Sequence, residues 1–333
     1  MRKLALWRAT ITAAGLASLC LPACSSAPSG ESQGSSSSTG DETELSIELE
    51  FEPAAHVLGG TLHVATNRPM RLVSTTIVGL ESSRPVPASG LPQAGPSTEL
   101  ATMILGLKAE RGYTFEVVLE SSDGSQETAE YVHQTPPLPE SFVPLEFVHS
   151  DPERMEPGVT FFDSTAREGF DSRGGYLVAV DELGDVVWYF TGPMVQQPCD
   201  LRRLSNGNLI FLGIGPNRIS TMAVEINMLG RVVATWSSPD LGIGAAHADL
   251  AEIPTPGGTG PILTAGIELR EIAGYPGDKT YSVVGDTIIE FSRAGEVTYE
   301  LALLDVLDPY RIVTPDFHSG FWGGVYGPGT KDW

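Results

Sequence analysis

His247 is the residue of this sequence whose surroundings best suit chemistry. It follows a turn segment of small residues, Gly242, Gly244, Ala245 and Ala246, which would let a ligand approach the imidazole. A histidine changes its charge near neutral pH and can donate a proton, accept one or carry a transferred group. On spacing alone, a loop histidine that caps a turn is the simpler interpretation.

Other candidates for chemistry are weaker. His318 lies in the aromatic and glycine-rich segment TPDFHSGFWGGVYGPG, whose rings could wall a pocket for an aromatic ligand or only pin a loop by packing. Asp305 and Asp308 suit a loop after a strand better than a general acid–base pair, because no other candidate converges on them. Three arginines could contact anions, although strand-surface positions are the simpler interpretation: Arg202, Arg203 and Arg218.

Familiar cofactor and catalytic motifs are missing from the sequence. It has no G-x-S-x-G, H-E-x-x-H, Walker A or C-x-x-C motif, and residues 213–218 (GIGPNR) suit a strand end better than a nucleotide loop. His56, His63 and His133 lack metal-ligand spacing, and we expect His63 and His133, which lie in strand patterns, to be structural. We therefore predict no metal site and no cofactor.

Three segments of the C-terminal half follow one pattern. Residues 176–188 read YLVAVDELGDVVW, residues 222–236 read MAVEINMLGRVVATW and residues 287–301 read TIIEFSRAGEVTYEL. Each is a β-branched run, a polar turn that ends in glycine, and a second alternating run closed by an aromatic residue. This alternation across a turn predicts a β-hairpin, because glycine can adopt φ > 0. The turn glycines are Gly184, Gly230 and Gly295.

A second hairpin is predicted between these modules. Residues 200–211 (DLRRLSNGNLIF) contain Asn206-Gly207, which favours a type I′ turn, and residues 249–264 (DLAEIPTPGGTGPILT) share the D-L opening. Two hairpins per repeat make four strands, which is one blade of a β-propeller. The module glycines are 46 and 65 residues apart, a spacing that suits such a repeat. The chain is thus expected to hold about three to four blades.

Propellers protect their strand edges by closing a ring, usually of about four to eight blades. Residues 302–333 contain no D-L-x-x-Φ opening and no N-G turn. The sequence is therefore expected to be a C-terminally truncated fragment of a propeller protein. The alternative is a short open sheet with an exposed edge.

The preceding segment, residues 45–135, predicts a β-sandwich. Strand-length runs recur about every 12 to 18 residues, and Leu107-x5-Tyr113 before an alternating strand resembles the tyrosine corner of fibronectin type III domains. We assign this domain no chemistry. The PPLP segment after it should be a stiff linker, and residues 140–333 form the partial propeller. The predicted fold class is all-β.

The N-terminus predicts export and lipidation. Residues 1–23 have a basic start and an apolar run too short to span a bilayer, as in a signal peptide. The sequence Leu21-Pro22-Ala23-Cys24 resembles the bacterial lipobox, so Cys24 is the predicted lipidation site. An ordinary signal peptide with an incidental cysteine is the alternative. If Cys24 is acylated, Cys199 has no disulfide partner and is best explained as a buried small hydrophobe.

Residues 24–44 are rich in Gly and Ser and should form a flexible, lipid-anchored tether. The residue after Cys24 is Ser25 and not Asp. In a Gram-negative host this favours sorting of the lipoprotein to the outer membrane, on the side that faces the periplasm. The chain of 333 residues has a net charge of −22, which opposes binding to nucleic acid and to anionic lipid headgroups. An anionic substrate would need local cationic or neutral donors.

From about Pro137 to Trp333 the chain resembles the bacterial arylsulfotransferase (aryl-sulfate sulfotransferase) family. The order and spacing of several segments carry the resemblance: Pro157-Gly158, YLVAVDELGDVVWYF, DLRRLSNGNLIF, HADLAEIP, and DTIIEFSRAGEVTYEL with LLDVLDP after it. It implies an N-terminal β-sandwich and a six-bladed propeller. Residues 331–333 (KDW) look like the start of the family's D-W-T-H-x-N segment.

The resemblance also implies a function: transfer of a sulfuryl group from an aryl sulfate donor to a phenolic acceptor, through a histidine that carries the group covalently. His247, in HADL, matches the first family histidine, which contacts the sulfuryl group. The second histidine, an arginine and the nucleophilic histidine would lie beyond Trp333. A non-catalytic β-propeller lipoprotein that serves as a binding scaffold is the alternative, because one fold hosts both functions.

Overall fold

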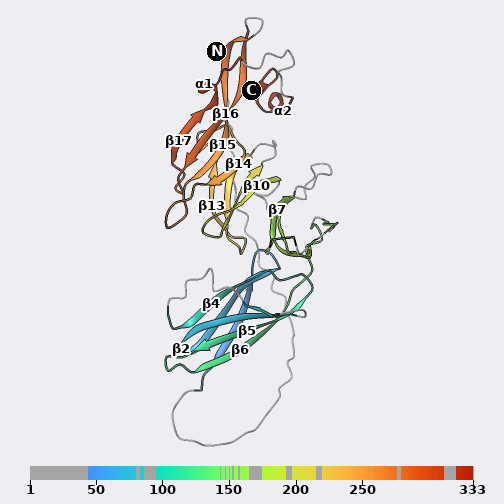
Figure 1. Ribbon diagram of the computed structural model, residues 1–333, viewed down its shortest axis with the longest axis vertical. Coiled ribbons are helices and arrows are strands. Elements are labelled where there is room, and N and C mark those ends of the chain that lie inside the picture. The colour runs from blue at the N-terminus through green and yellow to red at the C-terminus, as the bar shows by residue number, and fades with distance from the viewer. Residues whose placement is uncertain are drawn as a thin grey trace, which may run out of the picture. The chain divides into compact units, whose positions relative to one another are not determined.

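The computed structural model describes residues 44–332, with gaps at 80–82, 86–94, 143, 147, 150, 152–153, 157, 165–174, 193–196, 215–219, 276–278 and 311–319. The predictions for residues 1–43, including Cys24, and those for Arg218 and His318 lie outside the described residues. Within the described ranges, no helix is both long enough and apolar enough to span a bilayer. The described part of the chain is all-β, with two short helices after the last long strand (Figure 1).

Six antiparallel strands form the first sheet system: β1 (Ile47–Pro53), β2 (Gly59–Gly79), β3 (Ser83–Pro85), β4 (Ser97–Leu105), β5 (Gly112–Glu120) and β6 (Gln126–Gln134). The first part of β2 pairs with β1 and β4, whereas its second part pairs with β3 and β5. Alternate residues of these strands fill one core, which includes Leu62, Ile104 and Phe115. Buried and exposed side chains thus alternate along these strands, as the sequence pattern predicts.

Tyr113 makes the hydrogen bond that a tyrosine corner requires. Its hydroxyl accepts a hydrogen bond from the backbone N–H of Lys108, with an N–O distance of 2.9 Å. The fibronectin III-like sandwich itself stays a prediction. His63 is exposed and contacts Glu52 at 3.2 Å, while His133 packs against the rings of Phe51 and Phe115. Both are structural residues, as expected.

The strands that follow, as far as residue 302, form three antiparallel meanders. The first has three strands: β7 (Thr160–Ser164), β8 (Tyr176–Val180) and β9 (Val186–Phe190). The second has four: β10 (Gln197–Arg203), β11 (Leu209–Ile214), β12 (Ser220–Ile226) and β13 (Val232–Ser237). The third also has four: β14 (Ala245–Glu252), β15 (Ile262–Tyr275), β16 (Lys279–Phe291) and β17 (Val297–Ala302).

The meanders confirm the five hairpins expected from the sequence. The three modules form the β8–β9, β12–β13 and β16–β17 hairpins, and the D-L segments begin the β10–β11 and β14–β15 hairpins. A single pair, Ser220 with Ala246, connects the second and third meanders in one nine-stranded sheet. The arrangement is consistent with a propeller-like fold, while the number of blades stays a prediction.

The prediction of a type I′ turn at Asn206-Gly207 is wrong. Gly207 has φ 85°, but Asn206 is not in the left-handed region, which a type I′ turn requires at both central residues. The Gly207 N–H instead donates to Leu204 O at 2.9 Å, and the Leu204 N–H donates to Asn208 O at 2.8 Å. This is a type I turn with a glycine bulge. The turns at Gly184, Gly230 and Gly295 have the same two bonds.

Side chains reinforce these turns. Asp181 accepts hydrogen bonds through Oδ1 from the N–H groups of Leu183 and Asp185, and Asn227 does the same for Leu229 and Arg231. Such local bonds are typical of Asp and Asn in turns. The turn sequence, rather than the strands alone, therefore fixes each hairpin register.

Neighbouring meanders are also connected by aspartates on their first strands. Asp163 of β7 accepts a hydrogen bond from the N–H of Leu201 in β10, and burial raises the pKa of this carboxyl. Asp200 of β10 accepts one from the N–H of Leu250 in β14. Leu201 lies in the bulge of β10, and Leu250 directly follows the bulge of β14, where it pairs with Thr264. The two bonds thus involve the leucine of both D-L pairs and the aspartate of the first.

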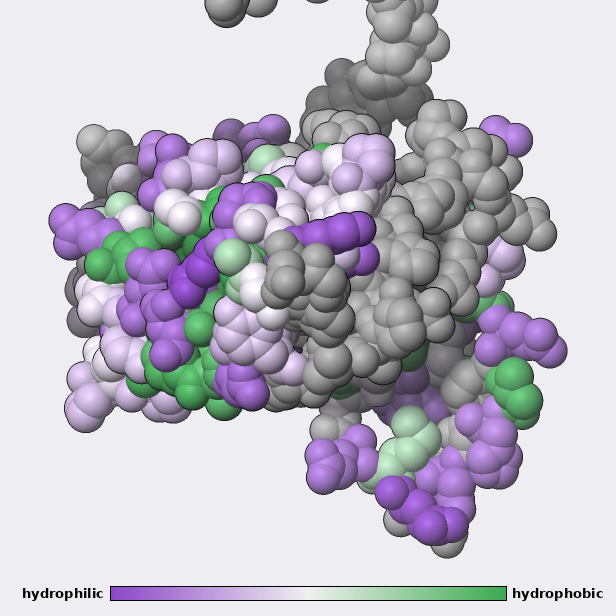
Figure 2. Space-filling view, turned by 90° about the horizontal axis from the view of Figure 1, so that it is seen from above, coloured by the Kyte–Doolittle hydropathy of each residue, from purple (hydrophilic) through white to green (hydrophobic). Residues whose placement is uncertain are grey.

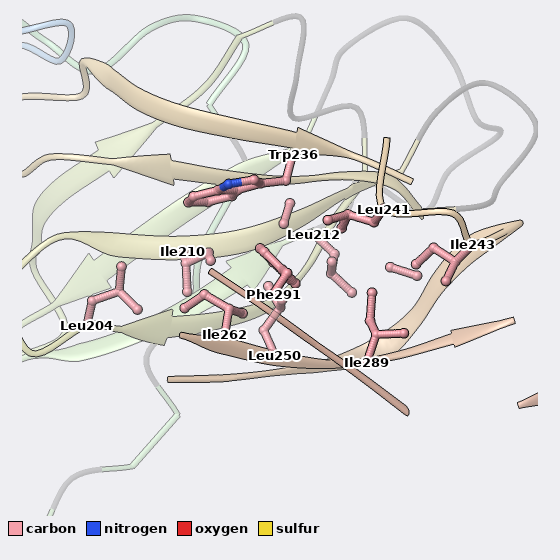
Figure 3. Close-up of a cluster of buried hydrophobic side chains, with 12 residues drawn as sticks. Leu204, Ile210, Leu212, Trp236, Leu241, Ile243, Leu250, Ile262, Ile289 and Phe291 are labelled. Atoms are coloured by element: carbon pink, nitrogen blue, oxygen red, sulfur yellow. The ribbon is translucent and has the colours of Figure 1, made fainter. Parts of the chain in front are cut away.

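A shared apolar core joins the second and third meanders. Ile210 and Leu212 of β11 and Trp236 of β13 meet Ile289 and Phe291 of β16 in one buried cluster (Figure 3). On the face seen in Figure 2, by contrast, hydrophilic and hydrophobic residues are interspersed among the described residues. Cys199 is half-buried and packs against the cluster, so it contributes to apolar packing.

A buried charge lies beside this core. Glu225 of β12 is fully buried, and its Oε1 accepts hydrogen bonds from the side-chain amides of Asn206 and Asn208 at 3.0 and 2.6 Å. Its Oε2 forms an ion pair with Arg293, which also lies over the Trp236 ring at 4.9 Å. Burial lowers the pKa of Arg293. Arg293 thus carries its charge into the junction between the two meanders.

His56 connects the first sheet system to the β12–β13 turn. The ring is buried, its Nδ1 accepts the Leu58 N–H at 3.3 Å, and its Nε2 lies 3.2 Å from Met228 O. This pairing suits the neutral tautomer with hydrogen on Nε2. Burial lowers its pKa from 6.5 to about 4, because a charged imidazole would lose its hydration.

We predict that His56 makes the protein sensitive to acid. Between about pH 6.5 and 4 the unfolded state binds a proton that the folded state excludes, so stability falls as the pH falls through this range. The loss should approach about 3 kcal/mol at pH 4. Denaturant unfolding at several pH values should show this slope, and His56→Gln should flatten it. His63→Gln is the matched control and should retain the slope. An equal slope in His56→Gln would contradict the prediction.

We also predict that Arg293→Met destabilises the protein by about 3 kcal/mol, because it leaves Glu225 buried without its counter-ion. Adding Glu225→Gln should recover much of this loss, since the amide carries no charge. The exposed pair of Arg231 with Glu52 provides the control, and Arg231→Met should cost less than about 1 kcal/mol. Equal losses for the two arginine variants in urea unfolding would refute a special role of the buried pair.

Candidate functional site

His247 lies in the bulge of β14. Between the paired residues Ala246 and Leu250 this strand has three residues, whereas β15 has only Ala265 between the partners Gly266 and Thr264. A bulge changes the direction of the side chains within it. The corresponding bulge in β10 contains only Asp200 and Leu201, between the paired residues Cys199 and Arg202. The extra residue in β14 therefore gives His247 a position that the preceding meander does not have.

Asp286 of β16 is the direct partner of His247. The distance from His247 Nδ1 to Asp286 Oδ1 is 2.8 Å, and both side chains are partly exposed. This hydrogen bond raises the pKa of His247 above its ordinary value, and the charges of Asp286, Asp332 and Asp249 act in the same direction. The imidazolium form is therefore favoured, and it can donate a hydrogen bond to an anion.

The C-terminal part of the described chain covers this end of the third meander. Helix α1 (Leu303–Val306) follows β17, and helix α2 (Gly320–Tyr326) and strand β18 (Lys331–Asp332) come after it. Strand β18 pairs with β16 in parallel, with Asp332 opposite Val284. Trp322 of α2 lies edge-on to the His247 ring at 6.1 Å (Figure 1 shows α2 beside β16). These elements bring Asp332 and Trp322 to His247.

Two of the small residues before His247, Gly244 and Ala245, make room for protein rather than for a ligand. A Cβ atom at Gly244 would lie 2.9 Å from Tyr326 Oη, and Ala245 is buried in a cluster with Trp322. Trp322 is only 7% exposed and stacks on Tyr326. For these two rings, aromatic packing is thus the better interpretation, and the segment is helical where we expected a loop.

The other candidates lie apart from His247 or only at its margin. Arg202 contacts Asp200 at 2.7 Å and Asp249 at 3.8 Å, so it reaches the acidic surroundings of His247. Asp305 pairs with Arg270, and Asp308 accepts the Tyr310 N–H at 2.9 Å; these contacts support the expected structural roles. Arg203 is an exposed residue of β10. Among the described residues no group of His, Cys, Asp and Glu is arranged to hold a metal ion.

Asp286 was missed in the sequence, although a signal for it existed. It lies nine residues before Gly295, and the equivalent positions of the other two modules hold Gly175 and Thr221. The acid is thus a non-recurring residue, as His247 is. Asp332 could not be found this way, because it belongs to no repeat and reaches the site only through the pairing of β18 with β16.

The charges around His247 act on a bound anion in opposite directions. An imidazolium can donate a hydrogen bond from Nε2 to an anion while its Nδ1 donates to Asp286. The carboxylates of Asp286, Asp332 and Asp249 disfavour a further negative charge. No hydrogen bond to His247 Nε2 is made by the residues that the structure describes.

Comparison with known proteins concerns the family to which the chain belongs. A search of curated proteins gives no match to the chain. The family described as Arylsulfotransferase (ASST) matches residues 145–333, which include all three meanders and His247. Since this match covers more than half of the sequence and confirms the resemblance noted from its motifs, the chain belongs to the arylsulfotransferase family.

Proposed function

We propose that this protein transfers a sulfuryl group from a phenolic sulfate ester to another phenol, by way of a sulfohistidine. The family match over residues 145–333 is the observation that carries the proposal. It also implies that the partners are an aryl sulfate donor and a phenol acceptor. The favoured imidazolium form of His247 supports a site for an anionic ester in a chain whose net charge is −22.

In this proposal His247 donates a hydrogen bond from Nε2 to a sulfuryl oxygen. A different histidine attacks the sulfur atom, forms the N–S bond and displaces the phenol oxygen, which takes up a proton. The acceptor phenol then attacks the same sulfur atom, loses its proton and frees the histidine. Charge develops on the oxygens during both transfers, and a fixed donor stabilises it.

The attacking histidine is the one that the family resemblance places after Trp333. In this sequence the family's D-W-T-H-x-N segment would start at Asp332. Asp332 pairs with Val284, two residues before Asp286 on β16, so this segment begins near the partner of His247. That proximity supports a shared site for His247 and the residues that would follow.

The proposal includes the architecture of the family. The three meanders are taken as blades of a six-bladed propeller, and residues 45–135 as a fibronectin III-like β-sandwich. The aspartate bonds between first strands and the tyrosine-corner hydrogen bond support these assignments. Functionally, such a ring would place the bulges of its first strands, and with them His247, at one end of a central channel.

We further propose that the mature protein is a lipoprotein of the cell envelope, anchored through Cys24 to the outer membrane and facing the periplasm. The support is the lipobox-like sequence LPAC after a basic, apolar leader. The Gly- and Ser-rich tether of residues 24–44 would hold the folded part at a distance from the bilayer.

His247→Ala should lower kcat for sulfuryl transfer from a chromogenic aryl sulfate to phenol by roughly a hundredfold, because one donor to the developing charge is removed. The assay follows release of the coloured phenol with protein that includes the residues after Trp333. His63→Ala, remote from the third meander, is the control and should retain the activity. Near-native turnover of His247→Ala would show that His247 is a structural residue. A protein without any transfer, but with an intact fold, would instead support a binding scaffold.

Cys24→Ala should release the exported protein from membranes into the soluble fraction. Two acyl chains on a lipidated cysteine bury many CH₂ groups at about 0.8 kcal/mol each, and this anchor would be lost. Detergent phase separation of both forms measures the change. Cys199→Ala is the matched control and should partition as the wild type does. Unchanged partitioning of Cys24→Ala would rule out the anchor.

A further inference from the structure

The contact between His247 and Asp286 spans a whole strand. His247 belongs to β14 and Asp286 to β16, and β15 lies between them. Asp286 shares its register row with Ile267 and Ala245, whose side chains are buried against Trp322. The carboxylate is thus fixed at the margin of a packed surface, and the bulge in β14 turns the imidazole toward it.

The hydrogen bond determines which ring nitrogen is available. A carboxylate only accepts hydrogen bonds, so the Nδ1 atom at 2.8 Å from Asp286 must carry the hydrogen. Nε2 is then the atom that can face a substrate. In a neutral ring Nε2 would accept a hydrogen bond, whereas in the imidazolium it donates one. Only the imidazolium can bond to a sulfuryl oxygen, which carries no hydrogen.

We propose that Asp286 is a positioning residue for His247: it orients the ring, keeps hydrogen on Nδ1 and thereby presents Nε2–H to the sulfuryl oxygens of the substrate. This inference rests on the proposed function. Asp286 itself does not touch the substrate in this arrangement, and its effect passes through the imidazole.

The surroundings of His247 decide how strongly Asp286 acts. Three acids face the ring from three strands: Asp286 from β16, Asp332 from β18 and Asp249 from β14, and the hydrogen bond to Asp286 contributes most to the raised pKa. On α2, Trp322 carries no charge, and burial raises the pKa of Tyr326, so this hydroxyl stays neutral. Asp249 is exposed and its charge is shared with Arg202. Removal of Asp286 should therefore have the largest effect.

The test combines titration of His247 by NMR with the pH profile of sulfuryl transfer. Asp286→Asn keeps an oxygen near Nδ1 but removes the charge, so the pKa of His247 should fall by about one pH unit or more. The alkaline limb of the kcat/KM profile should move in the same direction, and the rate near pH 8 should fall about tenfold. Asp286→Glu should restore part of both. Asp249→Asn removes a neighbouring charge without the hydrogen bond and should shift the titration less.

Two results would overturn the inference. One is an unchanged titration of His247 in Asp286→Asn; the other is a pH profile that does not move while the titration does. A purely structural role would lower the amount of folded protein without a change in either curve. If the wild type transfers no sulfuryl group, the proposed function fails and the positioning role fails with it. Transfer by the wild type with an unmoved profile in Asp286→Asn refutes the positioning role alone.

Discussion

The arrangement of the C-terminal strands depends on a bond between an aspartate side chain and the backbone of the next meander. Asp163 accepts the N–H of Leu201, and Asp200 accepts that of Leu250. Sheets placed face to face by apolar contacts alone could slide, whereas these bonds fix which residue of one first strand lies beside which residue of the next. Both bonds are made at or beside a bulge, and the bulge in β14 also contains His247. The connection between the second and third meanders and the position of the candidate site thus meet at one irregularity of β14.

Much of the fold could be predicted from the sequence because its information is local. Alternation and turn glycines were enough for the five hairpins, including the φ > 0 of Gly184, Gly230 and Gly295. The type I′ assignment of Asn206-Gly207 failed because the same pair also suits a type I turn with a glycine bulge, and pairing of the flanking residues decides between them. The extension of β15 and β16 to Tyr275 and Lys279 has no counterpart in the other modules and was not expected.

The site was predictable only in part, for a different reason. His247 could be singled out because it does not recur, and Asp286 met the same criterion without being recognised. Their contact needs the register of three strands, and the approach of Asp332 needs a parallel pairing between distant segments. Neither the contact nor the approach of Asp332 can be derived from the secondary-structure propensity of the residues or from the period of the hydrophobic pattern. Gly244 and Ala245, which were expected to let a ligand approach His247, instead accommodate the aromatic residues of α2.

The self-contained turns have a consequence for how the chain reaches its folded state. Asp181 and Asn227 close their turns with bonds to residues two and four positions further on, so most of each hairpin is specified within a few residues. Such short-range contacts form in about 1–10 μs, far faster than contacts between remote segments. The hairpins can therefore form early and independently. The junctions that include Asp200 and Glu225 need two such units already in register, so we expect them to form more slowly than the hairpins. The repeated hairpin thus has two effects: it can form quickly by itself, and a few polar bonds between meanders then determine how the hairpins are arranged.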